Sequence, residues 1–209
     1  LDGDEGGYTC AAGATTYVQA DTKQDVWSHA DDGDEGGTSL VAPFPVPLYG
    51  DTYTAAWAST NGVISFKEPL TYDGYVDKFP APIPSVDGEY DPNAAVYVHW
   101  QDWMVDASAG IYTRTTGTAA AKDRKWIVEW RNVRRSDDPY SRVSFEVIFD
   151  EATGSITTAY ADLDAADTSS RGRSHWWASR TVPAPSPTSP RTRRSHWSTG
   201  ADSRSPRTG

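Results

Sequence analysis

The sequence has almost no cysteine or methionine, with 1 of each in 209 residues. Because Cys10 has no second cysteine to pair with, an internal disulfide and a cysteine-based metal site are both excluded. Of the 4 histidines, only His29 and His99 precede the C-terminal tail, which argues against a zinc site. We interpret His99 as a solvent-facing or hydrogen-bonded strand residue. No apolar run approaches the ~18–20 residues that cross a bilayer, so we expect no membrane insertion.

Basic residues are also scarce, because 19 Lys and Arg face 29 Asp and Glu, for a net charge of −10. The imbalance is uneven: residues 1–170 hold 28 acidic and 11 basic residues, whereas residues 171–209 hold 1 acidic and 8 basic residues. Contacts to nucleic-acid phosphates need clustered Lys and Arg, so the acidic part argues against a nucleic-acid partner. Leu1 is neither a Met nor the start of a signal segment, which indicates a mature product or a fragment of a longer reading frame.

The chain is rich in aromatic residues, with 9 Trp and 11 Tyr, and its Val and Thr content also favours strands. Residues 125–133 alternate strictly, so Trp126, Val128 and Trp130 share one strand face. Residues 143–150 repeat the pattern, with Val and Phe expected to point inward. We favour a core position for these Trp side chains and keep a sugar-stacking surface as the alternative.

Turn signals separate these segments at intervals of about 10–12 residues, which is typical of a sandwich or barrel. Asn61-Gly62 between two apolar runs predicts a hairpin. Alternating prolines in residues 43–49 predict a sheet edge, because proline has no N–H to donate. The proline-rich residues 67–92 predict a long surface excursion. We therefore predict an all-β fold, an antiparallel β-sandwich with a disordered C-terminal tail.

Composition divides the chain into three parts. Residues 1–40 are acidic and rich in Gly and Asp, with one or two strands expected near 15–18 and 26–27. Residues 41–168 are expected to form the sandwich. Residues 169–209 are a Ser/Thr/Arg/Pro-rich tail, in which these types supply 28 of 41 positions. Without apolar side chains to bury, the tail cannot offset its ordering entropy.

Two interpretations of this tail stay open: a genuine linker and an out-of-frame translation of a GC-rich gene, which we favour. Trp has a single codon, so Trp176-Trp177 fixes a Val in the frame that starts two bases later. One choice of the remaining codons continues that frame as Gly-Ile-Glu-Asn-Gly, which would form a strand followed by a turn.

The order of motifs resembles the nidogen-type extracellular domain (NIDO) and the NIDO-like modules of secreted actinobacterial proteins. The matching segments are Phe44-Pro45-Val46-Pro47-Leu48-Tyr49-Gly50, Ser59-Thr60-Asn61-Gly62-Val63-Ile64-Ser65-Phe66, Trp100-Gln101-Asp102, Gly110-Ile111-Tyr112, Trp126-Ile127-Val128-Glu129-Trp130 and residues 143–149. The resemblance implies an extracellular β-rich domain linked with adhesion, often beside hydrolase or surface-anchoring domains in bacteria. It supplies no catalytic residues.

The loop Asp-Gly-Asp-Glu-Gly-Gly occurs twice, and its alternate carboxylates are Asp2 and Asp4 in the first copy and Asp32 and Asp34 in the second. Hard cations such as Ca²⁺ take oxygen ligands of this kind. The loops depart from the EF-hand pattern, because no Glu stands at the twelfth position. Solvated acidic turns and weak Ca²⁺ sites are therefore the two interpretations, and no other cofactor is expected.

A second candidate site lies where a strand meets a loop, at Trp100, Asp102, Trp103 and Asp106. A glycosidase needs two acids at a fixed separation in a cleft, one of them with a raised pKa, and acids four residues apart in a loop do not supply this. We favour a structural role for these residues and keep contact with a sugar or an ion as the alternative. A Ser-His-Asp triad is not indicated, because no nucleophile-elbow motif is present.

We therefore expect no enzyme activity. The function we expect is that of a non-catalytic extracellular module, secreted or at the cell surface, that serves adhesion or targeting within a larger protein. Its partner would be an extracellular protein or a glycan. A carbohydrate-binding module of a secreted hydrolase is the alternative, and a fragment of an enzyme with its catalytic domain elsewhere is a third hypothesis.

Overall fold

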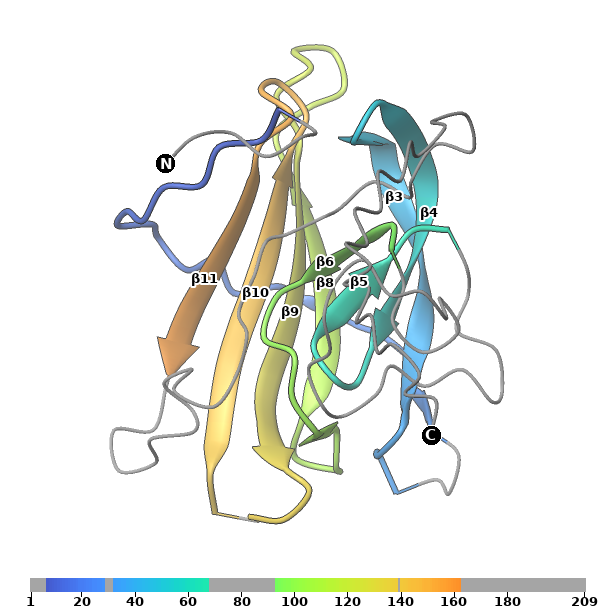
Figure 1. Cartoon of the computed structure of the whole chain (residues 1–209), viewed down its shortest axis with the longest axis vertical. Coiled ribbons are helices and arrows are strands. Elements are labelled where there is room, and N and C mark those ends of the chain that lie inside the picture. Colours follow the sequence, from blue (N-terminus) through green and yellow to red (C-terminus); the bar gives the residue numbers. More distant parts are fainter. Residues whose placement is uncertain (1–6, 29–31, 68–92, 139, 163–209) are drawn as a thin grey trace, which may run out of the picture.

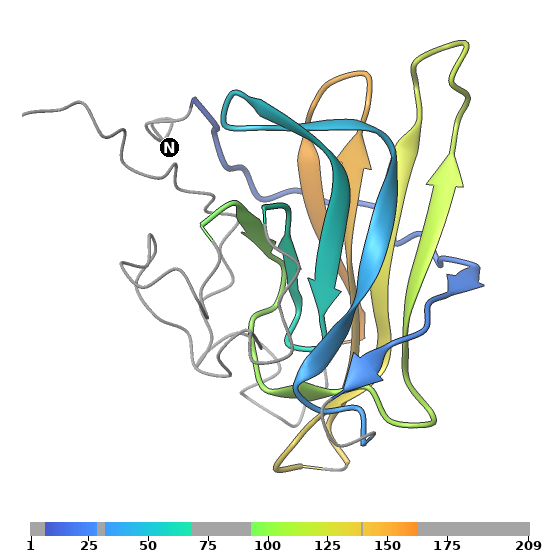
Figure 2. The ribbon, with the colours of Figure 1, turned by 90° about the vertical axis from the view of Figure 1, so that its right-hand side faces the viewer.

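The computed structural model describes residues 7–28, 32–67, 93–138 and 140–162, and these contain strands and loops without a helix. Two antiparallel sheets pack face to face (Figure 1 and Figure 2), which confirms the predicted β-sandwich. The large sheet contains β1 (Thr22–Lys23), β7 (Trp103–Met104), β8 (Gly110–Thr116), β9 (Lys125–Arg135), β10 (Arg142–Asp150) and β11 (Ile156–Asp162). The small sheet contains β2 (Trp27–Ser28), β3 (Gly36–Leu48), β4 (Asp51–Ser59), β5 (Val63–Ser65) and β6 (Ala95–Tyr97).

The order of the strands places β9 and β10 in the middle of the large sheet. That sheet runs β1-β8-β9-β10-β11, with β7 also paired to β9, and the small sheet runs β2-β3-β4-β5-β6. Hairpins connect most neighbours, so most pairing is between strands adjacent in the sequence. In this order β11 ends one sheet and β6 ends the other.

The core lies between the two sheets and is built from the side chains that the alternating pattern predicted to point inward. Trp126 and Trp130 of β9 are 2% and 0% exposed, and Phe145 and Phe149 of β10 are 0% and 1% exposed. Each Trp is paired across the strands with a Phe, and the ring centroids of both pairs lie 5.2 Å apart. The core interpretation of these Trp residues is confirmed, and the sugar-stacking surface is not formed.

The proline-rich part of β3 lies at a sheet edge, as its sequence predicts. Strand β2 pairs only with Gly36 and Gly37, so residues 43–48 have a described partner strand, β4, on one side only. Proline costs a sheet little where no neighbour needs its missing N–H.

The Asn61-Gly62 turn joins β4 and β5 as a hairpin, with Trp57 opposite Ser65 and Ala58 opposite Ile64. Gly62 has a φ of 75°, and a Cβ at this position would lie 2.3 Å from the carbonyl oxygen of His99. Only glycine fits such a conformation so close to another backbone segment. The turn therefore fixes how the chain after β6 packs on the small sheet.

The N-terminal residues depart from the prediction. Residues 7–21, here called the N-terminal strap, contain no strand, so the strand expected near 15–18 is not formed. In Figure 1 the strap passes along the side of β11 and then behind the large sheet. The two-residue strand β7 was not predicted, whereas the strand expected at 26–27 corresponds to β2.

Three predicted features lie wholly or mostly outside the described residues: the long excursion 67–92, the first acidic loop with Asp2 and Asp4, and the tail 169–209. The proposed boundary between residues 40 and 41 falls inside β3, which is continuous from Gly36 to Leu48.

Replacing Gly62 tests the close packing of this hairpin. Gly62→Ala should lower the free energy of unfolding by roughly 2–4 kcal/mol, from backbone strain plus the clash with His99. The matched control is Gly50→Ala, because Gly50 also has a positive φ, 88°, but nothing lies within 4 Å of the added Cβ. It should cost about 1 kcal/mol from strain alone. Equal losses for the two variants in urea unfolding would contradict the packing described for Gly62.

Candidate functional site

Trp100 and Trp103 hold the candidate site in place from inside the protein. They are 1% and 0% exposed. The Trp103 Nε1 donates to the carbonyl oxygen of His99 at 2.7 Å, and its backbone N donates to Oδ1 of Asn61 at 3.0 Å. Neither ring has a free face, so the alternative in which these two side chains contact a sugar is revised to a structural role.

His99 is also buried, at 2% exposed, and is not the solvent-facing strand residue that we considered. Its ring lies among aromatic rings, with centroids 4.9 Å from Trp103, 5.1 Å from Phe145 and 5.7 Å from Tyr160. It therefore belongs to the packing between the two sheets.

Asp106 joins the loop after β7 to the large sheet. Its Oδ2 accepts from Arg142 at 2.7 Å and from Arg134 at 3.0 Å, and its Oδ1 accepts from the hydroxyl of Ser108 at 2.8 Å. The hydrogen bond from Arg142, with those from Ser108 and Arg134, holds the pKa of Asp106 well below its usual range despite partial burial. A carboxylate held this way is a poor proton donor, and it fixes the loop.

The basic residues near the end of β9 are paired as expected in part. Arg135 pairs with Asp137 at 2.5 Å. Arg134 instead pairs with Asp106, and Arg131 pairs with Glu129 at 2.6 Å.

Three carboxylates meet at the loop end of the sandwich. Oxygen atoms of Asp34, Glu35 and Asp102 lie within 4.8 Å of one another. Asp34 and Asp102 were assigned to separate candidate sites in the sequence, and the structure brings them together. Asp32 caps the backbone N of Asp34 at 3.0 Å and is not part of the group.

Backbone contacts fix the two loops that carry these carboxylates. The N of Val105 donates to the carbonyl oxygen of Gly33 at 2.7 Å. A Cβ on Gly33, whose φ is 86°, would lie 2.1 Å from the oxygen of Val105. The Asn61 side chain connects both loops, because it also donates to Oε2 of Glu35 at 3.4 Å.

Asp102 has one satisfied and one unsatisfied oxygen. Its Oδ2 accepts from the hydroxyl of Ser136 at 2.5 Å. Its Oδ1 is buried and finds no hydrogen-bond partner among the described residues. Three clustered carboxylates repel each other unless one is protonated or a cation lies among them, and oxygen ligands of this kind suit Ca²⁺. The group is thus where this chain could hold a metal ion.

A second acidic pair, which the sequence analysis missed, lies under the N-terminal strap. Glu129 of β9 and Glu146 of β10 are cross-strand partners, 1% and 0% exposed. Glu129 accepts from the hydroxyl of Tyr17 at 3.0 Å and from the N of Ala20 at 2.7 Å, and Glu146 accepts from the N of Val18 at 2.9 Å.

These carboxylates anchor the strap and change each other's protonation. Burial, helped by the charge of Glu129 and opposed by the hydrogen bond from Val18, raises the pKa of Glu146 to about 7. Burial and the hydrogen bond to Glu129 also raise the pKa of the Tyr17 hydroxyl. A strong signal for this pair existed in the sequence: charged residues on the outer face of two otherwise apolar strands. Its burial depends on a strap more than 100 positions away, which alternation cannot show.

Comparison with known proteins gives one match. A family model described as NIDO related matches residues 7–187. No curated protein and no solved structure matches the chain. The described residues contain no helix that is long and apolar enough to cross a membrane.

Glu146 predicts how stability depends on pH. Because its pKa is raised above the ordinary value, the folded state binds the extra proton, and stability falls as pH rises from about 4.5 through 7. Glu146→Gln should remove roughly 2 kcal/mol of this loss between about pH 5 and pH 8, which urea unfolding measures. Glu151→Gln is the control, because its pairing with Arg124 lowers the pKa of Glu151. It should leave this pH window unchanged, and a wild-type slope in Glu146→Gln would contradict the assignment.

The three carboxylates predict weak calcium binding. A site of about millimolar affinity would contribute about 1 kcal/mol at about 10 mM Ca²⁺, or 2–4 °C in the unfolding midpoint. Asp102→Asn should abolish that rise, whereas Asp25→Asn, an equal charge change at an exposed position, should keep it. A midpoint that does not respond to Ca²⁺, or that responds equally in both variants, would leave only solvated acidic turns.

Proposed function

Because the chain belongs to the NIDO related family, a type of module found in extracellular proteins, we propose that it is a non-catalytic module that binds an extracellular partner for adhesion or targeting. The larger protein that contains it would supply any catalysis. We propose a secreted or cell-surface location.

The arrangement of the acidic residues supports a non-catalytic role. Asp106 is held by Arg142 and Arg134, and Glu129 is covered by the strap and paired with Arg131. Catalytic acids need an accessible cleft and a substrate position between them. The described carboxylates are instead used to fix loops and the strap.

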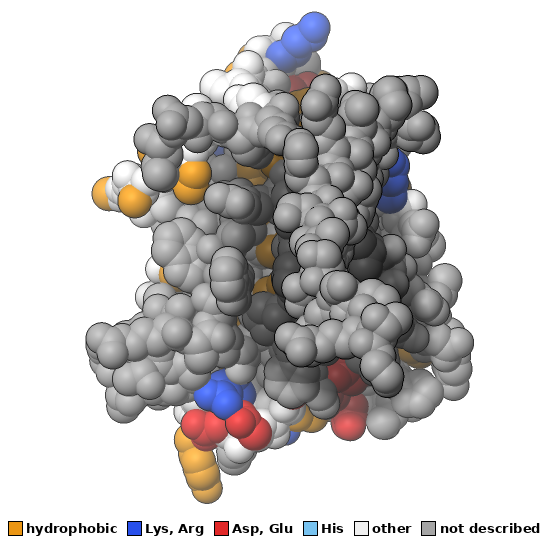
Figure 3. Space-filling model, viewed as in Figure 1, with side chains coloured by type: hydrophobic (Ala, Val, Ile, Leu, Met, Phe, Trp, Pro, Cys, Tyr) orange, Lys and Arg blue, Asp and Glu red, His pale blue; other side chains and the backbone are white. Residues whose placement is uncertain are grey.

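The loop end of the sandwich is the surface we propose for binding. It consists of residues 32–35, 102–109 and 136–141, which lie together at the lower end in Figure 1. Contacts already described join these three loops to one another. Figure 3 shows acidic, basic and hydrophobic side chains beside one another at this end. Loops held on a rigid scaffold are where binding residues are usually found.

Tyr140 is the single observation that carries this proposal. Its side chain is 90% exposed, the most exposed of the large hydrophobic residues described. Its backbone N donates to Oδ1 of Asp138 at 2.9 Å, which fixes the loop. A large aromatic residue displayed on a fixed loop loses little conformational freedom on binding, and Tyr is enriched among residues that dominate interfaces.

The carbohydrate-binding alternative now depends on different residues. Trp100 and Trp103 are buried, whereas Trp27 is 39% exposed. A module that stacks sugars would use Trp27 or Tyr140 instead.

Binding assays on immobilised matrix proteins and polysaccharides test this proposal. Tyr140→Ala should weaken the binding that the wild type shows by at least about tenfold, because truncating an interface-dominating aromatic residue commonly costs more than 1 kcal/mol. Val41→Ala is the control, since Val41 is 85% exposed on β3. The absence of wild-type binding, equal binding by Tyr140→Ala, or hydrolysis of these ligands would contradict the proposal. Loss confined to polysaccharides in Trp27→Ala would favour the alternative.

A further inference from the structure

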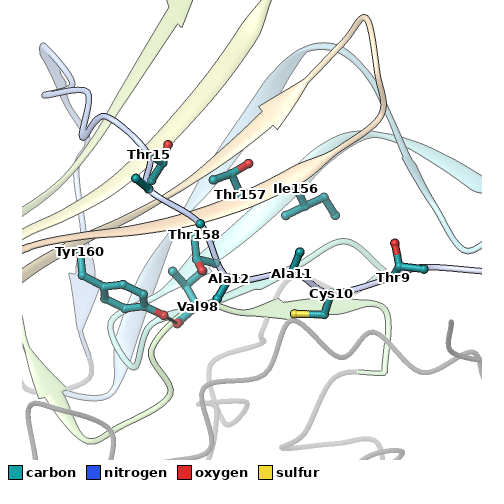
Figure 4. A pocket seen from close by; sticks show the side chains of 12 residues that line it. Thr9, Cys10, Ala11, Ala12, Thr15, Val98, Ile156, Thr157, Thr158 and Tyr160 are labelled. Carbon is teal, nitrogen blue, oxygen red and sulfur yellow. Dashed lines mark hydrogen bonds between the residues drawn. The ribbon is translucent and has the colours of Figure 1, made fainter. Parts of the chain in front are cut away.

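A groove of about 450 Å³ lies between the N-terminal strap and the sandwich. Residues 9–15 of the strap form one wall, and Val98, Ile156, Thr158 and Tyr160 contribute to the other (Figure 4). No charged side chain lines the groove. Its walls are small and uncharged, so it suits an extended peptide better than an ionic ligand.

The groove lies on the open side of the sandwich. Strand β11 ends the large sheet and β6 ends the small one, and Val98 follows β6 directly. Instead of a strand, the strap and Tyr160 close this side, with the Tyr160 hydroxyl donating to the carbonyl oxygen of Val98 at 2.7 Å. Ile156 and Tyr160 pack against the core while only partly buried. The corresponding Phe145 and Phe149 of β10 are 0% and 1% exposed.

The outer edge of β11 is also without a partner strand among the described residues. Its pairing is with β10, and no backbone hydrogen bond joins residues 156–162 to the strap. Alternate N–H and C=O groups of an edge strand point away from the sheet and can pair with an added strand. Partial burial of its inner face and an unpaired outer edge both indicate that β11 has a missing neighbour.

The coding sequence supplies a candidate for that neighbour. The family match continues to residue 187, beyond the end of β11 at Asp162. In the frame two bases later, the codons of His175-Trp176-Trp177-Ala178 must read Leu-Val-Gly, because His codons end in a pyrimidine, Trp has one codon and Ala codons begin with GC. One choice of the following codons continues this frame as Ile-Glu-Asn-Gly-Pro-Gly-Thr-Val-Ala-Tyr-Glu.

We propose that the outer edge of β11 and the groove beside it accept one further strand, encoded by the codons of residues 175–188 in this second frame. The added strand pairs with β11 and covers Ile156 and Tyr160. Its Val and Ile side chains face the uncharged walls of the groove. A segment with alternating apolar residues of this kind gains both the backbone bonds and the burial that an edge strand offers.

A synthetic peptide tests the proposal on the full 209-residue protein. The probe is Leu-Val-Gly-Ile-Glu-Asn-Gly-Pro-Gly-Thr-Val-Ala-Tyr-Glu, with a scrambled peptide as control. Cys10 lines the groove and is the only cysteine of the chain, so its rate of reaction with a thiol reagent reports occupancy. Saturating peptide should slow this reaction at least about fivefold and should protect amide hydrogens of residues 156–162 from exchange.

Two variants locate the site. Ala11→Trp fills the groove from the strap and should weaken peptide binding at least about tenfold, because a bulky ring would occupy the space of the peptide. Ala55→Trp places the same ring at an exposed position on β4 and should leave binding unchanged. Since both alanines are exposed, neither change enters the core.

Several results would overturn the proposal. These are equal effects of the scrambled peptide, binding without protection of β11, or binding that Ala11→Trp does not weaken. Protection of β11 by self-association without peptide would assign the edge to a second copy instead. A gene sequence with a stop codon in the second frame at these positions would exclude the strand we name.

Discussion

Packing of aromatic rings between the two sheets is the constraint on which the rest of this structure depends. Trp130 stacks on Phe145 and Trp126 stacks on Phe149, so the two central strands of the large sheet present one continuous aromatic face. Aromatic side chains bury more surface than any others and gain further from their stacking geometry. The Trp130 Nε1 also donates to the carbonyl oxygen of Ser59 at 2.8 Å, which links this face to the small sheet.

The aromatic core determines where the polar groups of the protein can act. Trp103 closes the core at one end and positions the segment that carries Asp102 and Asp106. Those carboxylates and their partners bring three loops together, and this is where Asp34 meets Asp102 and where Tyr140 is displayed. On the outer face of the large sheet, Glu129 and Glu146 anchor the N-terminal strap instead. The strap leaves the β11 edge partly covered, with the groove beside it.

The sequence predicted those parts of the structure that depend on local patterns. Alternation identified the inward residues of β9 and β10, and Asn61-Gly62 identified the hairpin, because both signals lie within a few residues. The burial of Glu129 was not predictable in this way, because it depends on Tyr17 and Ala20, which are distant in the chain. The meeting of Asp34 with Asp102 failed for the same reason. Trp103 beside acidic loop residues resembled a ligand contact, although its ring completes the core.

Native-state hydrogen exchange tests most directly whether one aromatic core holds both sheets. The measurement compares the free energy of opening for amides in β4 of the small sheet and β9 of the large sheet, in the wild type and in Phe145→Leu. If Phe145 supports both sheets, the variant lowers both opening free energies by the same amount, about 1–2 kcal/mol. A loss confined to β9, with β4 unchanged, would contradict a shared core.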